Sequence, residues 1–104
     1  MKRIIEGKRY DTETATEIAD WWNGCCQTDF SYVRERLYRT KSGAFFLHGD
    51  GGALSKYSQP CGNNAYCGGE RLIPMTQDEC MDWLESHGKS DEIERFFPDR
   101  VVDA

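Results

Sequence analysis

The sequence of 104 residues has no long hydrophobic run, no internal repeat, no low-complexity tract and no linker. The polar stretch from Glu6 to Arg9 ends the short apolar start Ile4-Ile5, so we expect neither a signal peptide nor a membrane span. Hydrophobic residues are few, at 38%, but the aromatic share of 12% is too high for a disordered chain. We therefore predict one folded domain, residues 1–104, in the cytoplasm.

Catalytic and cofactor-binding motifs are also missing. The stretch 49–52 (Gly-Asp-Gly-Gly) lacks the Lys and Ser/Thr of a phosphate-binding loop, and Asp50 would repel phosphate. We interpret this stretch as a tight turn that needs positive φ. No pattern places either histidine, His48 or His87, beside a nucleophile. We predict no catalytic residues, no cofactor and no enzymatic activity; a pocket hidden in the long Gly/Asn loop is the alternative.

Cysteine use favours free thiols, because the number is odd and no export signal is present. The five are Cys25, Cys26, Cys61, Cys67 and Cys80. A zinc site is poorly supported: five residues separate Cys61 from Cys67, where zinc ligand pairs usually have about two to four between them. We predict no metal. A small ligand- or zinc-binding module built from residues 49–69 and the cysteines stays open as an alternative function.

Two segments with helix-start signals frame the predicted fold. Thr14 to Glu17 fits a capping box, and the next apolar residues share one helical face, so we expect an N-terminal helix that ends at Asn23-Gly24. That apolar face consists of Ala15, Ile18, Ala19 and Trp22. Thr76 and Glu79 form a second capping box, before a helix that ends at Gly88. Its buried stripe consists of Cys80, Trp83, Leu84 and His87. Ser90 is expected to cap a third helix, which Pro98 stops.

Between these helices the pattern changes to strands. Residues 3–10 indicate a short strand or extended arm, and 32–48 indicate a hairpin with its turn at 40–43. Residues 49–69 form a long loop, which is either functional or contains a short strand near 53–57, and 70–73 are a last strand. We predict an α+β fold, with a small antiparallel sheet (a hairpin plus edge strands) packed against the N-terminal helix and the C-terminal helix pair.

The predicted hairpin has two chemically different faces. One carries Val33, Glu35, Leu37 and Arg39, and the other carries Tyr32, Arg34, Arg36 and Tyr38. Arginine interleaved with aromatic rings can hold nucleic acid, but the net charge of −5 opposes binding to a phosphate backbone. We interpret these residues as cross-strand pairs and predict no direct nucleic-acid partner.

Charge is distributed unevenly. Residues 76–104 carry nine carboxylates against three bases, whereas residues 1–75 are nearly neutral. A one-sided field attracts a positively charged partner, and a dense carboxylate face can imitate the phosphates that a basic groove holds. The alternative is a solvated helix face with acids that complement the helix dipoles. The residues predicted to bind a basic partner are Asp78, Glu79, Asp82, Glu85, Asp91, Glu92 and Glu94.

Three stretches resemble a family of small uncharacterised bacterial proteins found in phages, plasmids and integrated elements. They are residues 8–15, residues 37–52, and Ile73-Pro74-Met75-Thr76 with Trp83 downstream. The family has no established catalytic residues to carry over. Small acidic proteins of mobile elements include anti-CRISPR inhibitors. The resemblance therefore implies an inhibitor that acts in the host cytoplasm. Its partner would be a basic surface of a host protein or nucleoprotein complex, such as a CRISPR effector, whose nucleic-acid binding it blocks; no membrane is implied.

Overall fold

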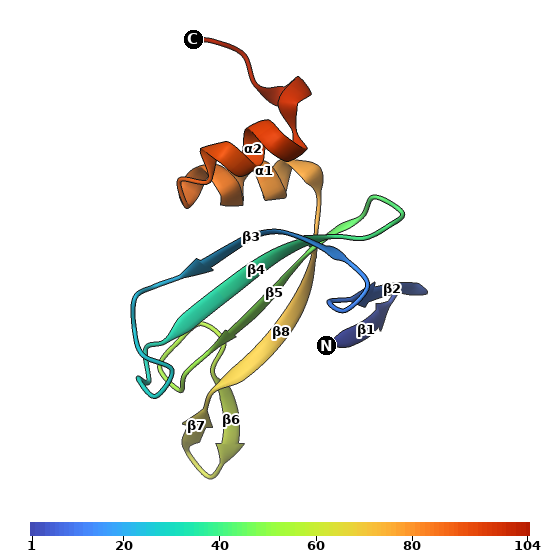
Figure 1. Cartoon of the computed structure of the whole chain (residues 1–104). Coiled ribbons are helices and arrows are strands. Elements are labelled where there is room, and N and C mark those ends of the chain that lie inside the picture. Colours follow the sequence, from blue (N-terminus) through green and yellow to red (C-terminus); the bar gives the residue numbers. More distant parts are fainter.

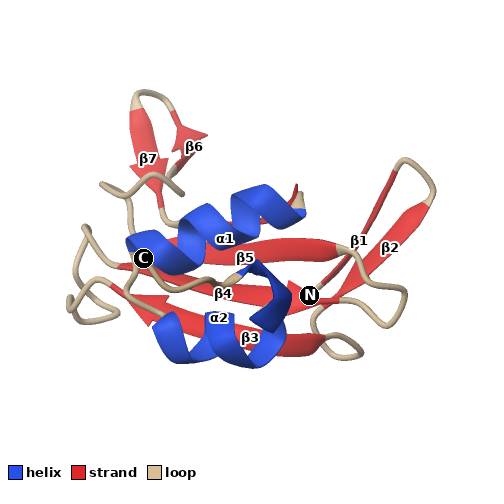
Figure 2. Ribbon diagram, turned by 90° about the horizontal axis from the view of Figure 1, so that it is seen from above, coloured by secondary structure: helices blue, strands red, loops and turns tan.

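Four strands pair in antiparallel fashion at the centre of the protein, in the order β3-β4-β5-β8. The computed structural model describes residues 1–104 (Figure 1). The strands are β3 (Thr16–Trp22), β4 (Val33–Arg39), β5 (Phe45–Gly51) and β8 (Gly69–Met75). Helices α1 (Gln77–Ser86) and α2 (Ser90–Phe96) lie over one face of this sheet, and the 3-10 helix η1 (Pro98–Arg100) follows them (Figure 2). The α+β class is confirmed.

Two small hairpins are attached to the central sheet. Strands β1 (Lys2–Ile5) and β2 (Lys8–Asp11) form the first, so the predicted N-terminal strand is in fact two strands. This hairpin covers part of the sheet face opposite the helices, where Tyr10 joins Tyr38, Phe46 and Leu72 in a buried cluster. Strands β6 (Gln59–Gly62) and β7 (Ala65–Cys67) form the second hairpin.

The central hairpin of β4 and β5 has the predicted turn and the predicted faces. Arg39 pairs with Phe45, and Gly43 adopts a φ of 92° in the turn. Leu37 faces the helices and is fully buried. Tyr38, on the opposite face, is also buried, because the β1–β2 hairpin lies against it.

The predicted N-terminal helix is wrong, because residues 16–22 form the edge strand β3. A register irregularity between Glu17 and Ala19 explains the error. Such a bulge breaks the two-residue alternation of a strand, so that Ile18 and Ala19 are both buried and the apolar spacing imitates a helix. The β-branched and aromatic residues of this segment favour a strand.

The prediction of a tight turn at residues 49–52 is also wrong. Strand β5 continues to Gly51, and neither Gly49 nor Gly52 has a positive φ. Gly49 is needed for space, because a Cβ at this position would overlap the buried ring of Tyr57. Residues 53–57 form turns, whereas the hidden strands lie at 59–67, and β8 is longer than the predicted strand at 70–73.

The C-terminal helices follow their signals with one exception. The side chain of Thr76 accepts from the Glu79 amide at 3.2 Å, and Glu79 Oε1 accepts from the Thr76 amide at 2.9 Å. Ser90 does not cap α2, since Lys89 holds the N-cap position and makes no side-chain cap bond. Lys89 also closes α1, because its amide donates to the Leu84 carbonyl beyond Gly88, so no residue remains between the helices for a separate cap.

The main core lies between the helices and the sheet. It consists of Ile18, Ala19, Leu37, Leu47, Cys80, Met81, Trp83, Leu84, Ile93 and Phe97. Cys80 is fully buried, as predicted, and burial raises the pKa of its thiol to about 12.

Cys61 and Cys67 form a disulfide across the β6–β7 hairpin, with their Cα atoms 5.8 Å apart. The prediction of free thiols is therefore wrong for this pair, because the unforeseen hairpin brings the two residues close together. Cys25, Cys26 and Cys80 remain free.

We predict that protein purified without reductant has three thiols per chain when titrated with Ellman's reagent in denaturant, because Cys80 reacts only after unfolding. Prior reduction should raise the count to five. Five thiols without reduction, in samples blocked at lysis, would contradict the disulfide.

We predict that Gly49→Ala lowers the free energy of unfolding by about 2–3 kcal/mol, because Tyr57 has to move from its buried position. Gly62→Ala is the matched control, since its Cβ would meet only the Ala65 side chain at 4.0 Å. Urea unfolding of both variants measures the difference. Equal stability of the two variants would show that the Gly49 site has room.

Candidate functional site

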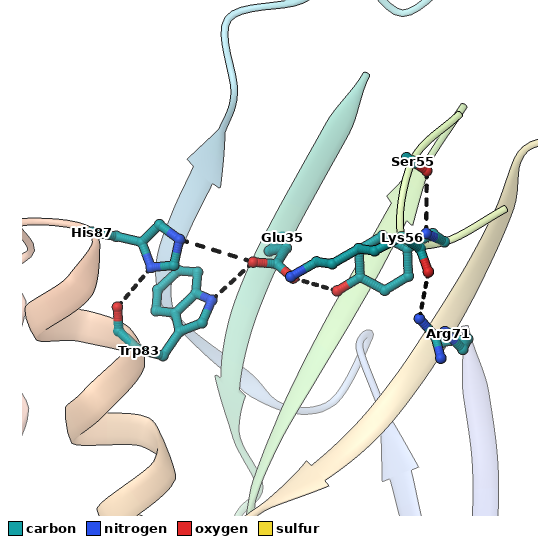
Figure 3. A network of polar contacts seen from close by, with 7 residues as sticks. Glu35, Ser55, Lys56, Arg71, Trp83 and His87 are labelled. Carbon is teal, nitrogen blue, oxygen red and sulfur yellow. Dashed lines mark hydrogen bonds and ion pairs between the residues drawn. The ribbon is translucent and has the colours of Figure 1, made fainter. Parts of the chain in front are cut away.

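A buried carboxylate, Glu35, joins the sheet to the helices. It lies in the middle of β4, faces the helices and is 1% exposed. Trp83 Nε1 donates to Glu35 Oε1 at 3.0 Å, and the Lys56 ammonium lies 2.7 Å from Oε2 (Figure 3). The Tyr57 hydroxyl also donates to Oε2. Three segments of the chain, namely β4, the loop before β6 and α1, therefore meet at one charge.

His87 completes this cluster on the helix side. Its ring lies between those of Trp21 and Trp83, at centroid distances of 4.5 and 4.4 Å. Nδ1 lies 2.7 Å from the Trp83 carbonyl, which can only accept, so Nδ1 carries a hydrogen. Nε2 lies 4.0 Å from Glu35 Oε1 (Figure 3).

Opposing effects set the ionisation of Glu35. Burial is the largest and raises its pKa, but the bonds from Lys56, Tyr57 and Trp83 together outweigh burial, so the pKa lies below its ordinary value. Burial and the bond to Glu35 raise the pKa of Tyr57. Glu35 is therefore a carboxylate and Tyr57 a neutral phenol at pH 7.

Glu35 acts as a structural anchor. Both of its oxygens accept hydrogen bonds, and it lines neither of the two pockets described below. The sequence indicates that Glu35 shares one strand face with Val33 and Leu37, but it does not indicate that Glu35 joins the sheet to the helices. The available signal was a charge on an apolar face, which requires partners when buried.

The seven predicted acidic residues separate into two groups. Four of them complement helix starts: Asp78 and Glu79 in the first turn of α1, and Asp91 and Glu92 in that of α2. Glu79 is the capping-box partner of Thr76, and an Arg100 nitrogen donates to Asp78 at 2.8 Å.

The other three acids have no such role. Asp82, Glu85 and Glu94 are exposed and form no ion pair or side-chain hydrogen bond within the chain. Glu85 lies in the last turn of α1, which has no basic residue, and there the helix dipole disfavours a negative charge. Helix stability therefore does not explain Glu85.

Glu85 and Glu94 line the same groove of about 360 Å³, one from each helix. Apolar side chains also line this groove: Met81, Ile93, Val101 and Val102. Val102 is 87% exposed. Arg100 is the one basic residue of the groove, and it is bound to Asp78. We call this feature the acidic groove.

The arginines on the opposite sheet face are paired with acids. Arg34 donates to Asp20 through Nε at 3.1 Å and Nη2 at 2.6 Å, and this contact lowers the pKa of Asp20. Arg36 Nε lies 3.7 Å from Glu17 Oε1. These contacts are the cross-strand pairs that the sequence indicates.

The structure contains neither a cluster of metal-ligating side chains nor a helix that could span a membrane. No group of three or more Cys, His, Asp or Glu side chains is arranged to hold a metal ion. No helix has the length and hydropathy needed to cross a bilayer.

The second histidine, His48, is also paired with an acid. Its Nε2 lies 2.9 Å from Glu70 Oε2, on the sheet face opposite the helices.

Comparisons with protein-family models, with curated proteins and with solved structures gave no match.

We predict that Glu35→Gln destabilises the protein by about 2 kcal/mol at pH 7, because a neutral amide is a weaker acceptor for Tyr57 and Trp83 and adds a donor beside Lys56. Because its folded-state pKa is lowered, Glu35 contributes stability above its ordinary pKa of 4.5, and this contribution disappears as the pH falls through the folded-state value. The difference in the free energy of unfolding between wild type and variant should therefore become smaller below about pH 4.5.

Urea unfolding from pH 7 to pH 3 measures this difference. The control is Glu13→Gln, an exposed change that should follow the wild type throughout. A Glu35→Gln deficit that stays constant down to pH 3 would show that the charge of Glu35 is not what stabilises the fold.

Proposed function

We propose that the protein is a non-enzymatic acidic inhibitor that binds a basic protein surface through the acidic groove. The observation that carries the proposal is the placement of Glu85 and Glu94, which line one groove from two helices and have no intramolecular partner. Acids that stabilise a helix belong in its first turn, whereas Glu85 stands in the last. A cation supplied by a partner gives this charge a role.

The lining of the acidic groove fits a protein surface better than a small ion. Carboxylates at its edge attract and orient a basic partner, and the adjacent valines and Met81 offer apolar area that a partner can bury. Asp82, one turn before Glu85 on α1, extends the acidic rim.

The concrete partner in this proposal is a CRISPR effector complex in the host cytoplasm. Such a complex holds nucleic acid with lysine and arginine, and bound carboxylates would exclude the phosphates from those residues. The choice of this partner rests on the resemblance to mobile-element proteins of residues 8–15, residues 37–52, and Ile73-Pro74-Met75-Thr76 with Trp83 downstream. The Cys61–Cys67 disulfide is an observation against a cytoplasmic location, because disulfides are rare in the reducing cytoplasm.

The alternative of a zinc-binding module has less support. Two of its proposed ligands, Cys61 and Cys67, are joined to each other and cannot bind zinc as thiolates. No observation in the loop region 49–69 favours a metal.

We predict that Glu85→Lys/Glu94→Lys abolishes capture of the partner while the fold is retained, because a lysine in the last turn of α1 suits the helix dipole. Tagged protein is incubated with guide-loaded CRISPR effectors, and captured protein and target-DNA binding are both measured. Wild type should capture an effector and displace its DNA, and the variant should lose at least about 100-fold in affinity.

The matched control is Glu6→Lys/Glu13→Lys, which makes the same change in net charge at exposed acids of the N-terminal hairpin region. Loss of capture in this control as well would show that net charge, not the acidic groove, drives binding. Unchanged capture by Glu85→Lys/Glu94→Lys would refute the proposed role of the acidic groove in binding. Failure of the wild type to bind any effector would refute the CRISPR effector as the partner.

A further inference from the structure

A second pocket, of about 510 Å³, opens where three loop segments meet. Its walls come from residues 27–30 and Tyr32, from residues 50–53, and from residues 66–68. The last segment includes the end of β7, which lies far from the helices, at the opposite end of the protein in the view of Figure 1. This pocket is therefore separate from the acidic groove.

Backbone packing builds this pocket into the fold. The Gly52 amide donates to the Tyr32 carbonyl at 2.9 Å, and the Leu54 amide donates to the Phe30 carbonyl at 2.8 Å. A Cβ on Gly52 or Gly68 would collide with backbone carbonyls of the neighbouring segments. The glycines thus allow the three segments to approach closely, and the pocket shape follows from that approach.

The lining of the pocket combines negative charge with aromatic rings. Two carboxylates, Asp29 and Asp50, line it, and no basic side chain does. Asp50 makes no side-chain hydrogen bond or ion pair, and Asp29 accepts only from the Ser31 amide, through Oδ1. The aromatic lining residues are Phe30, Tyr32 and Tyr66.

The groups that face Asp50 across the sheet form no ion pair with it. Its register partner on β4 is Arg34, whose Nε and Nη2 are both bound to Asp20. Its register partner on β8 is Glu70, another acid, which is paired with His48.

Large apolar side chains at this end of the protein remain uncovered. Phe30 is 66% exposed, Tyr66 64% and Leu54 74%. Leu54 is held beside Phe30 by the backbone hydrogen bond between them. Exposed rings beside a polar pocket are typical of surfaces that a protein partner covers.

We infer that this pocket binds an arginine side chain presented by a partner protein. A guanidinium is planar, so it stacks on aromatic rings and at the same time donates two parallel hydrogen bonds to a carboxylate. Lysine offers a compact, strongly hydrated charge and uses the rings less well. Phe30 and Tyr66 supply the rings, Asp50 the carboxylate, and Leu54 the apolar contact for the partner backbone. This site does not depend on the acidic groove.

The test uses the full chain labelled with ¹⁵N and three capped tripeptides, Gly-Arg-Gly, Gly-Lys-Gly and Gly-citrulline-Gly. Citrulline keeps the shape of arginine without its charge. The arginine peptide should shift the amide signals of residues 29–32, 50–53 and 66–68, with a dissociation constant on the order of 1 mM for a single side chain. The lysine peptide should bind several-fold more weakly, and the citrulline peptide should give no saturable shift.

Matched variants locate the site. Asp50→Asn keeps the shape of the side chain and should weaken binding of the arginine peptide at least about tenfold. Tyr66→Ala removes an exposed ring and should weaken this binding about threefold. Asp103→Asn is the control and should bind as wild type does. The amide spectrum of each variant reports its fold directly.

Equal amide shifts from the arginine and citrulline peptides would overturn the inference. So would a lysine peptide that binds as tightly as the arginine peptide, or amide shifts that lie outside the three segments. Glu85→Lys/Glu94→Lys should bind the arginine peptide normally, so failure of the acidic groove and failure of this pocket are distinguishable.

Discussion

A carboxylate removed from water has to receive hydrogen bonds from the protein, and Glu35 receives them from distant parts of the chain. Trp83 on α1 and Tyr57 in the loop after β5 both donate to it, so helix, sheet and loop are held at fixed positions relative to one charge. This requirement also explains why β5 contains Gly49, since the ring of Tyr57 crosses that strand on its way to Glu35.

Both proposed binding surfaces are connected to this centre. The acidic groove lies on α1 and α2, and α1 is attached to the sheet through Trp83 and His87. The arginine pocket includes residues 50–53, which lead directly into the loop that carries Lys56 and Tyr57. Partners at the two proposed sites would therefore meet surfaces held by the same buried group, although the charged residues of the two surfaces are different.

Local signals predicted much of the fold. The capping box at Thr76, the stripe containing Cys80 and the turn at Gly43 were readable because each depends on residues close in sequence. Strand β3 could not be predicted from such local signals, since its bulge replaces the alternating pattern of a strand with one that suits a helix. The Cys61–Cys67 bond, the role of Glu35 and the space needed at Gly49 depend on contacts between distant segments, which one sequence does not reveal. The acidic residues were found by composition, but only the structure separates Glu85 and Glu94 from those that stabilise helix starts.

The long sequence separation of the Glu35 contacts has a consequence for folding. Trp83 lies 48 residues after Glu35 in the sequence. During synthesis β4 emerges well before α1, so until α1 is made Glu35 can receive hydrogen bonds from Lys56 and Tyr57 but not from Trp83. We expect a charge on the inner face of the incomplete sheet to favour its hydration and to oppose the edge-to-edge association to which bare strands are prone. The same carboxylate is therefore expected to protect the nascent chain before it joins β4 to α1 in the folded protein.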